Sequence, residues 1–273
     1  VPDPANLLDY ERRLEAREFE LVNGTLNTTG ACRHGDVNND LQITQADVDL
    51  AMEIGLGVNT WPNTSCYPKA ADINNDDYVD QADAVQIKRW LKGRSTAQGP
   101  DYFNPTPRSA KGFDLNSLSY AQMDSKATNY VSLGDLKGKR NQEVEVPLQF
   151  TTTGDYSPLA GFSAIIGFVK GPNGATFVRA RLGDSLLDNY TFVAIEGGQV
   201  PGQDATSGSV RLAASSADSL GAKNETVVLV YLTFKIGSSA PEDRKLAVQI
   251  NAFSSSDPFG QTPKHGATGQ VKV

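Results

Sequence analysis

Two stretches of the chain decide its fold: Asp36-Val37-Asn38-Asn39-Asp40-Leu41-Gln42-Ile43-Thr44-Gln45-Ala46-Asp47 and Asp72-Ile73-Asn74-Asn75-Asp76-Asp77-Tyr78-Val79-Asp80-Gln81-Ala82-Asp83. Both fit the pattern D-x-N-x-D-x-x-x-x-x-x-D, and the second begins 36 positions after the first. A hard cation such as Ca²⁺ takes oxygens from loop positions 1, 3, 5, 7, 9 and 12, with a backbone carbonyl at position 7. The predicted ligands are therefore Asp36, Asn38, Asp40, Gln42, Thr44 and Asp47 in the first loop and Asp72, Asn74, Asp76, Tyr78, Asp80 and Asp83 in the second.

For a single match of this kind, an acidic, solvated turn and a calcium loop would be equally good interpretations. Two copies that share Asp-x-Asn-Asn-Asp and Gln-Ala-Asp favour binding of two calcium ions instead. Position 6, normally Gly at the sharp turn, is Leu41 in the first loop and Asp77 in the second, which leaves the calcium affinity open. The second loop has more carboxylates at ligand positions, because Asp80 replaces Thr44, so we expect it to bind more tightly.

The residues around the loops distinguish this pair from a full EF-hand, in which a helix precedes each loop. Gly, Pro and small polar residues precede both loops and predict no helix there. A helix is predicted after each loop, over Ala46 to Ile54 and Ala82 to Leu91. This duplicated loop-then-helix unit resembles the dockerin module of cellulosome-type proteins, over about residues 31–94.

The dockerin resemblance implies a partner-binding face. Loop positions 10, 11, 17 and 18 of dockerins face the partner cohesin, and here they are Gln45, Ala46, Met52 and Glu53, then Gln81, Ala82, Lys88 and Arg89. The Gln-Ala pair repeats, but Met52-Glu53 and Lys88-Arg89 differ in charge, so a partner would distinguish the two faces. The alternative for Lys88 and Arg89 is that they only favour a helix C-terminus.

The two cysteines of the chain, Cys32 and Cys66, precede the first ligand of their loops by four and six residues. Such places in paired repeats can meet, which predicts a disulfide in an oxidising compartment. Two buried free thiols or a metal pair are the alternatives.

The second half of the chain, residues 129–273, predicts strands separated by Gly, Pro, Asn and Ser turns. Glu143–Phe150 alternates with period two, and Val227–Ile236 is dense enough for a buried central strand. Eight or nine strands suggest a two-sheet sandwich. The order of features resembles a cohesin, a jelly-roll sandwich, with Gly161–Phe168 where cohesins have a strand of the partner-binding sheet. Immunoglobulin-like and adhesin sandwiches are the alternative.

The fold class is therefore multidomain: a small α-helical dockerin-like calcium module plus an all-β cohesin-like sandwich. The remaining segments are residues 1–30, an N-terminal extension with a helix predicted from Pro4 to Leu21, and a linker at 95–128. The start Val1-Pro2-Asp3-Pro4 does not have the pattern of a signal peptide, which suggests a processed mature end. Five Asn-x-Ser/Thr sequons are candidate glycosylation acceptors, at Asn23, Asn27, Asn63, Asn189 and Asn224.

Composition argues against several function classes. A formal net charge of −7 argues against a nucleic-acid partner, and no apolar run approaches the length of a membrane span. The sequence has two histidines, His34 and His265, and no nucleophile elbow, phosphate loop or zinc-helix motif, so we expect no enzyme. A carboxylate pair of the glycosidase type is the enzymatic alternative, because acidic residues are common in the chain.

We expect an extracellular or cell-surface assembly protein whose calcium module docks onto a cohesin-like domain, head-to-tail between copies in a filament or array. One alternative is an adaptor that joins foreign cohesin and dockerin proteins. Another is a carbohydrate-binding or adhesive sandwich on a calcium-stabilised stalk, with Tyr156, Phe177, Tyr190 and Phe192 as candidate exposed aromatics.

Overall fold

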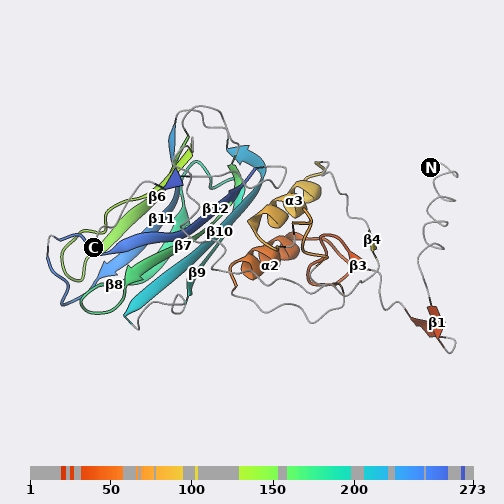
Figure 1. The fold of residues 1–273 in the computed structure, drawn as a ribbon, viewed down its shortest axis with the longest axis horizontal. Helices are drawn as coiled ribbons and strands as arrows, with labels where there is room; N and C mark the ends of the chain where they lie inside the picture. Colours follow the sequence, from red (N-terminus) through yellow and green to blue (C-terminus); the bar gives the residue numbers. More distant parts are fainter. Residues whose placement is uncertain are drawn as a thin grey trace.

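The protein is described as a computed structural model that covers residues 20–22, 25–27, 32–57, 66, 69–76, 78–94, 102–103, 129–152, 159–197, 206–220, 225–242, 244–257 and 266–267. Two bodies make up most of this part of the chain, a pair of helices with their loops and a β-sandwich (Figure 1). The predicted combination of helical module and all-β domain is therefore confirmed.

The helical module contains α2 (Gln45–Gly55) and α3 (Gln81–Leu91), each beginning one residue before its predicted start. Both helices begin with a capping box, in which the N-cap side chain bonds to the helix and the third helical residue bonds back to the N-cap. The N-caps are Thr44 and Asp80, and the returning carboxylates come from Asp47 and Asp83. The residues at loop positions 9 and 12 therefore cap the start of each helix, in addition to being predicted ligands.

The module has its own hydrophobic core. Its buried members include Ile43 and Val79, which stand at position 8 of their loops. Other members are Val37, Val48, Ile54, Ile73 and Ile87. The cluster also includes a residue of the sandwich, Ala213. The core of the module is therefore continuous with the surface of the second body.

Two short two-stranded ribbons lie outside the helices and the sandwich. β3 (Cys32–Arg33) pairs with β4 (Tyr102–Phe103), which belongs to the predicted linker. β1 (Glu20–Val22) pairs with β2 (Thr25–Asn27). The predicted helix up to Leu21 is therefore wrong at its end, where the extended β1 pairing replaces it, and its earlier part lies outside the described residues.

The sandwich has two sheets. The four-stranded sheet has the order β12-β7-β10-β9, with bounds Val248–Ser256, Leu159–Val169, Ser207–Leu220 and Tyr190–Gly197. The five-stranded sheet has the order β13-β5-β6-β11-β8, with bounds Gly266–Ala267, Asn129–Leu133, Glu143–Thr152, Thr226–Ile236 and Ala175–Leu182. All described pairings within the two sheets are antiparallel except β13 with β5.

The sandwich core fills the space between the sheets. Phe150, Phe162, Leu212, Leu232 and Phe234 are among its fully buried side chains. Side chains alternate between the two faces of a strand, so the other face of the four-stranded sheet points away from this core. β7 is nevertheless buried along almost its whole length, so a second layer covers its outer face.

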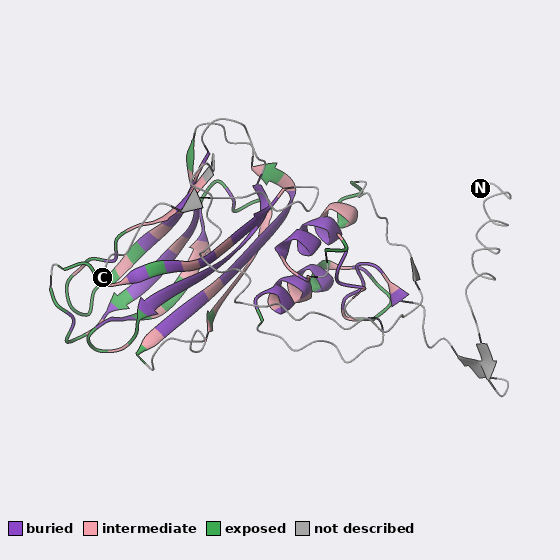
Figure 2. Cartoon of the chain, viewed as in Figure 1, coloured by how far each residue is buried: buried purple, intermediate pink, exposed green. Residues whose placement is uncertain are grey.

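That second layer is the helical module. α3 lies across β10, β7 and β12, and α2 meets β9 and β10 (Figure 1). Figure 2 shows the two helices and the facing strands largely in the colour of buried residues. Within one chain, the module therefore covers the outer face of the four-stranded sheet.

Candidate functional site

The first acidic loop is organised by its own carboxylates. Asp36 accepts backbone N–H bonds from Asp40 and Leu41 at 3.0 and 2.9 Å, and Asp40 accepts one from Gln42 at 2.8 Å. Asp47, at the start of α2, accepts bonds from the N–H groups of Val37 at 2.8 Å and of the N-cap residue. The predicted ligand side chains therefore point into the loop, and their bonds to these amides hold its backbone in a curved conformation.

The second loop repeats this arrangement. The N–H of Asp76 donates to Asp72 at 3.1 Å and that of Tyr78 donates to Asp76 at 2.9 Å. Asp83 accepts from Ile73 at 2.7 Å and from the backbone of its own N-cap at 2.9 Å. Residues 36 positions apart therefore occupy equivalent places, as the repeated sequence predicts.

Negative charge is concentrated in both loops. Burial raises the pKa of Asp36 and Asp47, partly opposed by the backbone N–H donors. In the second loop, burial and the nearby Asp76 carboxylate raise the pKa of Asp80 to about 7, and burial followed by repulsion from Asp80 raises that of Asp83 well above its usual value. A bound cation would relieve this repulsion.

The donor chemistry of both loops suits a hard cation. The side chains at the predicted ligand positions carry carboxylate, amide or hydroxyl oxygens, and none carries sulfur or an imidazole. Among the described residues, no three acidic, histidine or cysteine side chains form a group that could hold a metal ion by themselves. Amide, hydroxyl and backbone oxygens would therefore have to complete a calcium shell.

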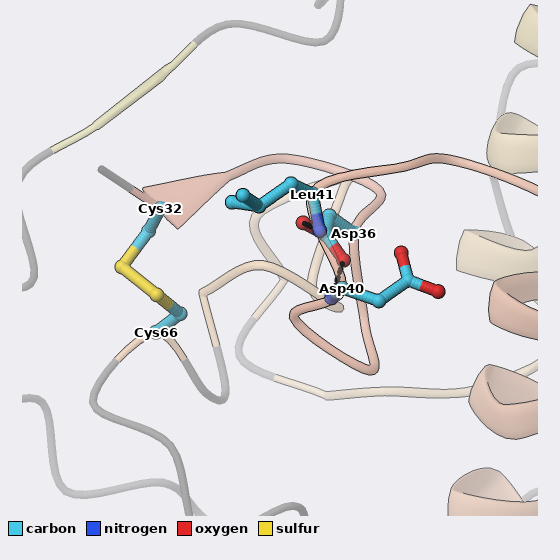
Figure 3. Close-up of a disulfide and its surroundings, with 5 residues drawn as sticks. All are labelled: Cys32, Asp36, Asp40, Leu41 and Cys66. Atoms are coloured by element: carbon cyan, nitrogen blue, oxygen red, sulfur yellow. Dashed lines mark hydrogen bonds between the residues drawn. A yellow bond between two sulfur atoms is a disulfide. The ribbon is translucent and has the colours of Figure 1, made fainter. Parts of the chain in front are cut away.

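Leu41, at the turn position where Gly is usual, adopts φ +71°, in the left-handed region that favours glycine. Its side chain points out of the loop and is 70% exposed (Figure 3). The loop therefore forms with leucine at this position. The equivalent Asp77 lies outside the described residues.

Cys32 and Cys66 form the predicted disulfide, with Cα atoms 5.2 Å apart (Figure 3). Both cysteines are buried beside Ala70, whose carbonyl accepts the N–H of Gly35 at 2.8 Å. The disulfide therefore ties together the segments that lead into the two loops.

The sheet face under the helices is built from small side chains: Gly161 and Ser163 on β7, Ala213 and Ser215 on β10, and Ser254 on β12. A Cβ atom at Gly161 would lie 2.8 Å from Val85 Cγ2 of α3 and 2.8 Å from Ser256 Oγ. This face can therefore take a helix in close contact.

Two residues of α3 make buried hydrogen bonds to this face. Gln81 accepts the Ser163 hydroxyl at 2.7 Å and donates to Ser254 Oγ at 3.0 Å. Lys88 Nζ donates to Thr191 Oγ1 at 2.5 Å and to the Ser215 carbonyl at 2.9 Å. These contacts anchor both ends of α3 on the sheet.

Three arginines complete the contact at its edges. Arg89 and Arg94 both donate to the carbonyl of Ala217, at 3.2 and 2.9 Å, and Arg94 also pairs with Asp218. From the sandwich, Arg211 donates to the Leu56 carbonyl at the end of α2 at 2.6 Å. Cations of the module thus meet carbonyl and carboxylate oxygens at the end of β10.

The two repeats contribute unequally. Gln81 and Ala82 are buried, with exposures of 1% and 0%, whereas their counterparts Gln45 and Ala46 are exposed, although Gln45 reaches Thr191 at 3.2 Å. Met52 lies in the buried cluster that also contains Ala213, and Glu53 is half-buried. The face predicted for the second repeat is thus the one seated on the sheet.

The other candidate residues fall elsewhere. Asn189 is an exposed turn residue and Asn27 lies in β2, whereas Asn23, Asn63 and Asn224 are outside the described residues. Phe177, Tyr190 and Phe192 are half-buried and pack against the sandwich core, and Tyr156 is outside the described residues. Among the described helices, none is long and apolar enough to cross a membrane.

The cohesin resemblance placed Gly161–Phe168, which includes Ser163, in the partner-binding sheet, but sequence reasoning missed the contact residues on the other strands. Thr191, Ser215 and Ser254 are small polar residues within strands, and no motif marks them. One signal was available: the Gly161–Phe168 stretch is apolar or small at nearly every position, as in a strand covered on both faces.

Residues 34–92 match the family model of the dockerin type I domain, which confirms the predicted dockerin module. No curated protein sequence matches the chain. Among solved structures, the chain is similar to the third cohesin ScaC of Acetivibrio cellulolyticus in complex with the ScaB dockerin, with 20% identity, a TM-score of 0.40, and coverage of 53% of this chain and 98% of that one. It is also similar to a non-cellulosomal cohesin from Archaeoglobus fulgidus, with 15% identity, a TM-score of 0.36, and coverage of 52% and 86% respectively.

Proposed function

We propose that this chain is a non-catalytic extracellular assembly protein, in which a calcium-folded dockerin module docks onto a cohesin-like sandwich. The observation that carries the proposal is the seating of α3 on the small-residue face of the four-stranded sheet, through Gln81 and Lys88. Buried hydrogen bonds between close-packed surfaces are typical of specific interfaces.

Calcium is the cation that suits the loops. Each loop offers six oxygen donors, burial and neighbouring carboxylates raise the pKa values of Asp80 and Asp83, and no soft ligand stands at these positions. Because Asp47 and Asp83 are both predicted ligands and capping residues, an ion at each loop would stabilise the start of α2 and α3. Calcium would thereby shape the face that docks.

Assembly between copies follows from the two surfaces. Each copy carries one module and one sheet face, and these surfaces differ from each other. A contact between the module of one copy and the sheet of the next is heterologous, and successive contacts of that kind extend into a filament or array unless they close. We propose this head-to-tail arrangement.

An extracellular location is supported by two features. The Cys32–Cys66 disulfide is of the kind that persists in oxidising environments. Calcium loops of extracellular modules bind at about 0.1 to 1 mM, concentrations that exist outside cells.

Light scattering of the full chain tests the proposal. With calcium, the average mass should grow as protein concentration rises from the micromolar to the millimolar range, and chelator should reverse the growth. A variant with Asp36→Ala and Asp72→Ala should not grow, whereas a control with the exposed Asp184→Ala should behave as the wild type. A mass that stays monomeric at every concentration in calcium would contradict assembly between copies.

A further inference from the structure

Among the described residues, the contacts between the module and the sheet are made within a single chain. Gln81 is 173 positions from Ser254, and Lys88 is 127 positions from Ser215. The same surfaces are the ones that a second copy would need. One chain therefore cannot use its module on its own sheet and on a neighbour at the same time.

We infer that the module also closes onto the sandwich of its own chain, and that this closed monomer competes with assembly between copies. The inference rests on the proposed function, because it uses the same docking contact. It adds a partner that the proposed function does not require, namely the chain itself.

The quality of the contact supports closure as a competitive state. Lys88 is 8% exposed and Ser163 is 3% exposed, so their polar atoms have lost most of their water. Hydrogen bonds across the contact replace the bonds to water that these atoms have lost. Opening the monomer would expose the small-residue face and the buried side of α3 together.

Covalent connection sets the balance between the two states. Two sites joined in one chain meet at an effective concentration on the order of millimolar. At micromolar protein, closure within the chain would therefore be favoured over docking to a second copy by about a factor of a thousand. Assembly between copies would begin only near millimolar protein. Closure thus acts as a concentration threshold.

Two complementary full-length variants separate closure from docking. Lys88→Glu places a carboxylate against the Ser215 carbonyl and breaks the module side. Ser163→Arg fills the sheet face beneath Gln81 and breaks the sandwich side. Either change alone should prevent both closure and self-assembly, because each chain then has only one working surface.

Mixing the two variants restores one intact pair of surfaces in trans. In calcium at about 10 µM protein, we expect each variant alone to be a monomer that is more expanded than the wild type, and the mixture to form a 1:1 dimer by light scattering. The wild type should remain a compact monomer at the same concentration. Ser254→Arg, on the neighbouring strand, repeats the sheet-side test in case one variant does not fold.

Matched controls are available on both bodies. Lys92→Glu reverses a charge on the same helix end at an exposed position, and Thr176→Arg places the same side chain on an exposed residue of β8. Both should behave as the wild type.

The possible failures are distinguishable. If folded variants do not pair, the docking contact is absent and both the proposed function and the inference fall. If the variants pair but the wild type assembles at the same low concentration, docking stands and closure within the chain is overturned. Only pairing of the variants together with a compact wild-type monomer supports the inference.

Discussion

Lys88 should make docking depend on pH. Its side chain is 8% exposed, and burial, followed by repulsion from Lys92, lowers its pKa from 10.5 to about 8, against the attraction of Asp49. When the module is undocked, the interface no longer buries this side chain, so its pKa should return toward 10.5. Docking is therefore linked to release of a proton.

The direction of the effect follows from these two pKa values. Below pH 8 the ammonium is present in both states, and the docked state bears the whole cost of burying it. Between pH 8 and 10.5 the docked state loses the proton first, so the affinity rises with pH. Each pKa unit is worth about 1.4 kcal/mol, so the full rise is at most about 3 kcal/mol, or about 300-fold.

Isothermal titration of a 31–94 fragment into a 129–273 fragment, in saturating calcium and carbonate-free buffer, measures this dependence from pH 7.5 to 10. The Lys88→Met variant carries the residue that the first repeat has at the same position, Met52, and should show no such rise. Lys92→Met is the matched control, and it should keep the rise with a slightly higher midpoint because one repelling charge is gone.

Two results would refute the reasoning. A flat wild-type profile over this range would mean that Lys88 is not buried on docking. An equal rise in the Lys88→Met variant would assign the titration to another group. Buffers with different ionisation enthalpies give a second readout, because up to one proton should be released per docking event near pH 9.

Four further changes have defined outcomes. Asp36→Ala with Asp72→Ala should abolish calcium uptake in calorimetry and remove the helical signal of the module, because both loops lose their first ligand. Leu41→Gly should stabilise the module by up to about 1 kcal/mol in urea unfolding, because glycine relieves the left-handed backbone at φ +71°. Cys32→Ser should destabilise it by about 3 to 4 kcal/mol, since the disulfide closes a loop over a separation of 34 residues. Gly161→Leu should undock the module, because the new Cβ would lie 2.8 Å from a side chain of α3.

Each of these has a contradicting result. Unchanged calcium binding in the double aspartate variant would show that the ligand assignment is wrong. A less stable Leu41→Gly variant would mean that the leucine side chain contributes more than its exposure suggests. If the oxidised and the reduced wild type unfold at the same urea concentration, the disulfide does not stabilise the module. If Gly161→Leu docks normally, the contact lies elsewhere.

The helical module could be predicted closely because the residues that determine it are near one another in the sequence. Ligand residues at fixed offsets, Gln-Ala-Asp at each helix start and apolar residues at loop position 8 all act within a dozen positions. The strands Glu143–Thr152 and Thr226–Ile236 were also predictable, since alternation and a dense apolar run are local patterns.

The sheet face was harder to predict because its residues come from distant parts of the sequence. Ser163, Ser215 and Ser254 come from three strands that are adjacent only after the sandwich forms. The prediction of a linker at 95–128 did not indicate that the two bodies meet within one chain. Burial of Lys88 likewise depends on Thr191 and Ser215, which are more than 100 positions away.

The central claim is that calcium shapes the module for docking on the sandwich, and the calcium dependence of binding between the 31–94 and 129–273 fragments tests it most directly. We predict 1:1 binding in calcium, loss of binding in excess chelator and recovery when calcium is restored, with circular dichroism reporting the fold of each fragment. Binding of the same strength in chelator, or no binding between two folded fragments in saturating calcium, would contradict the claim.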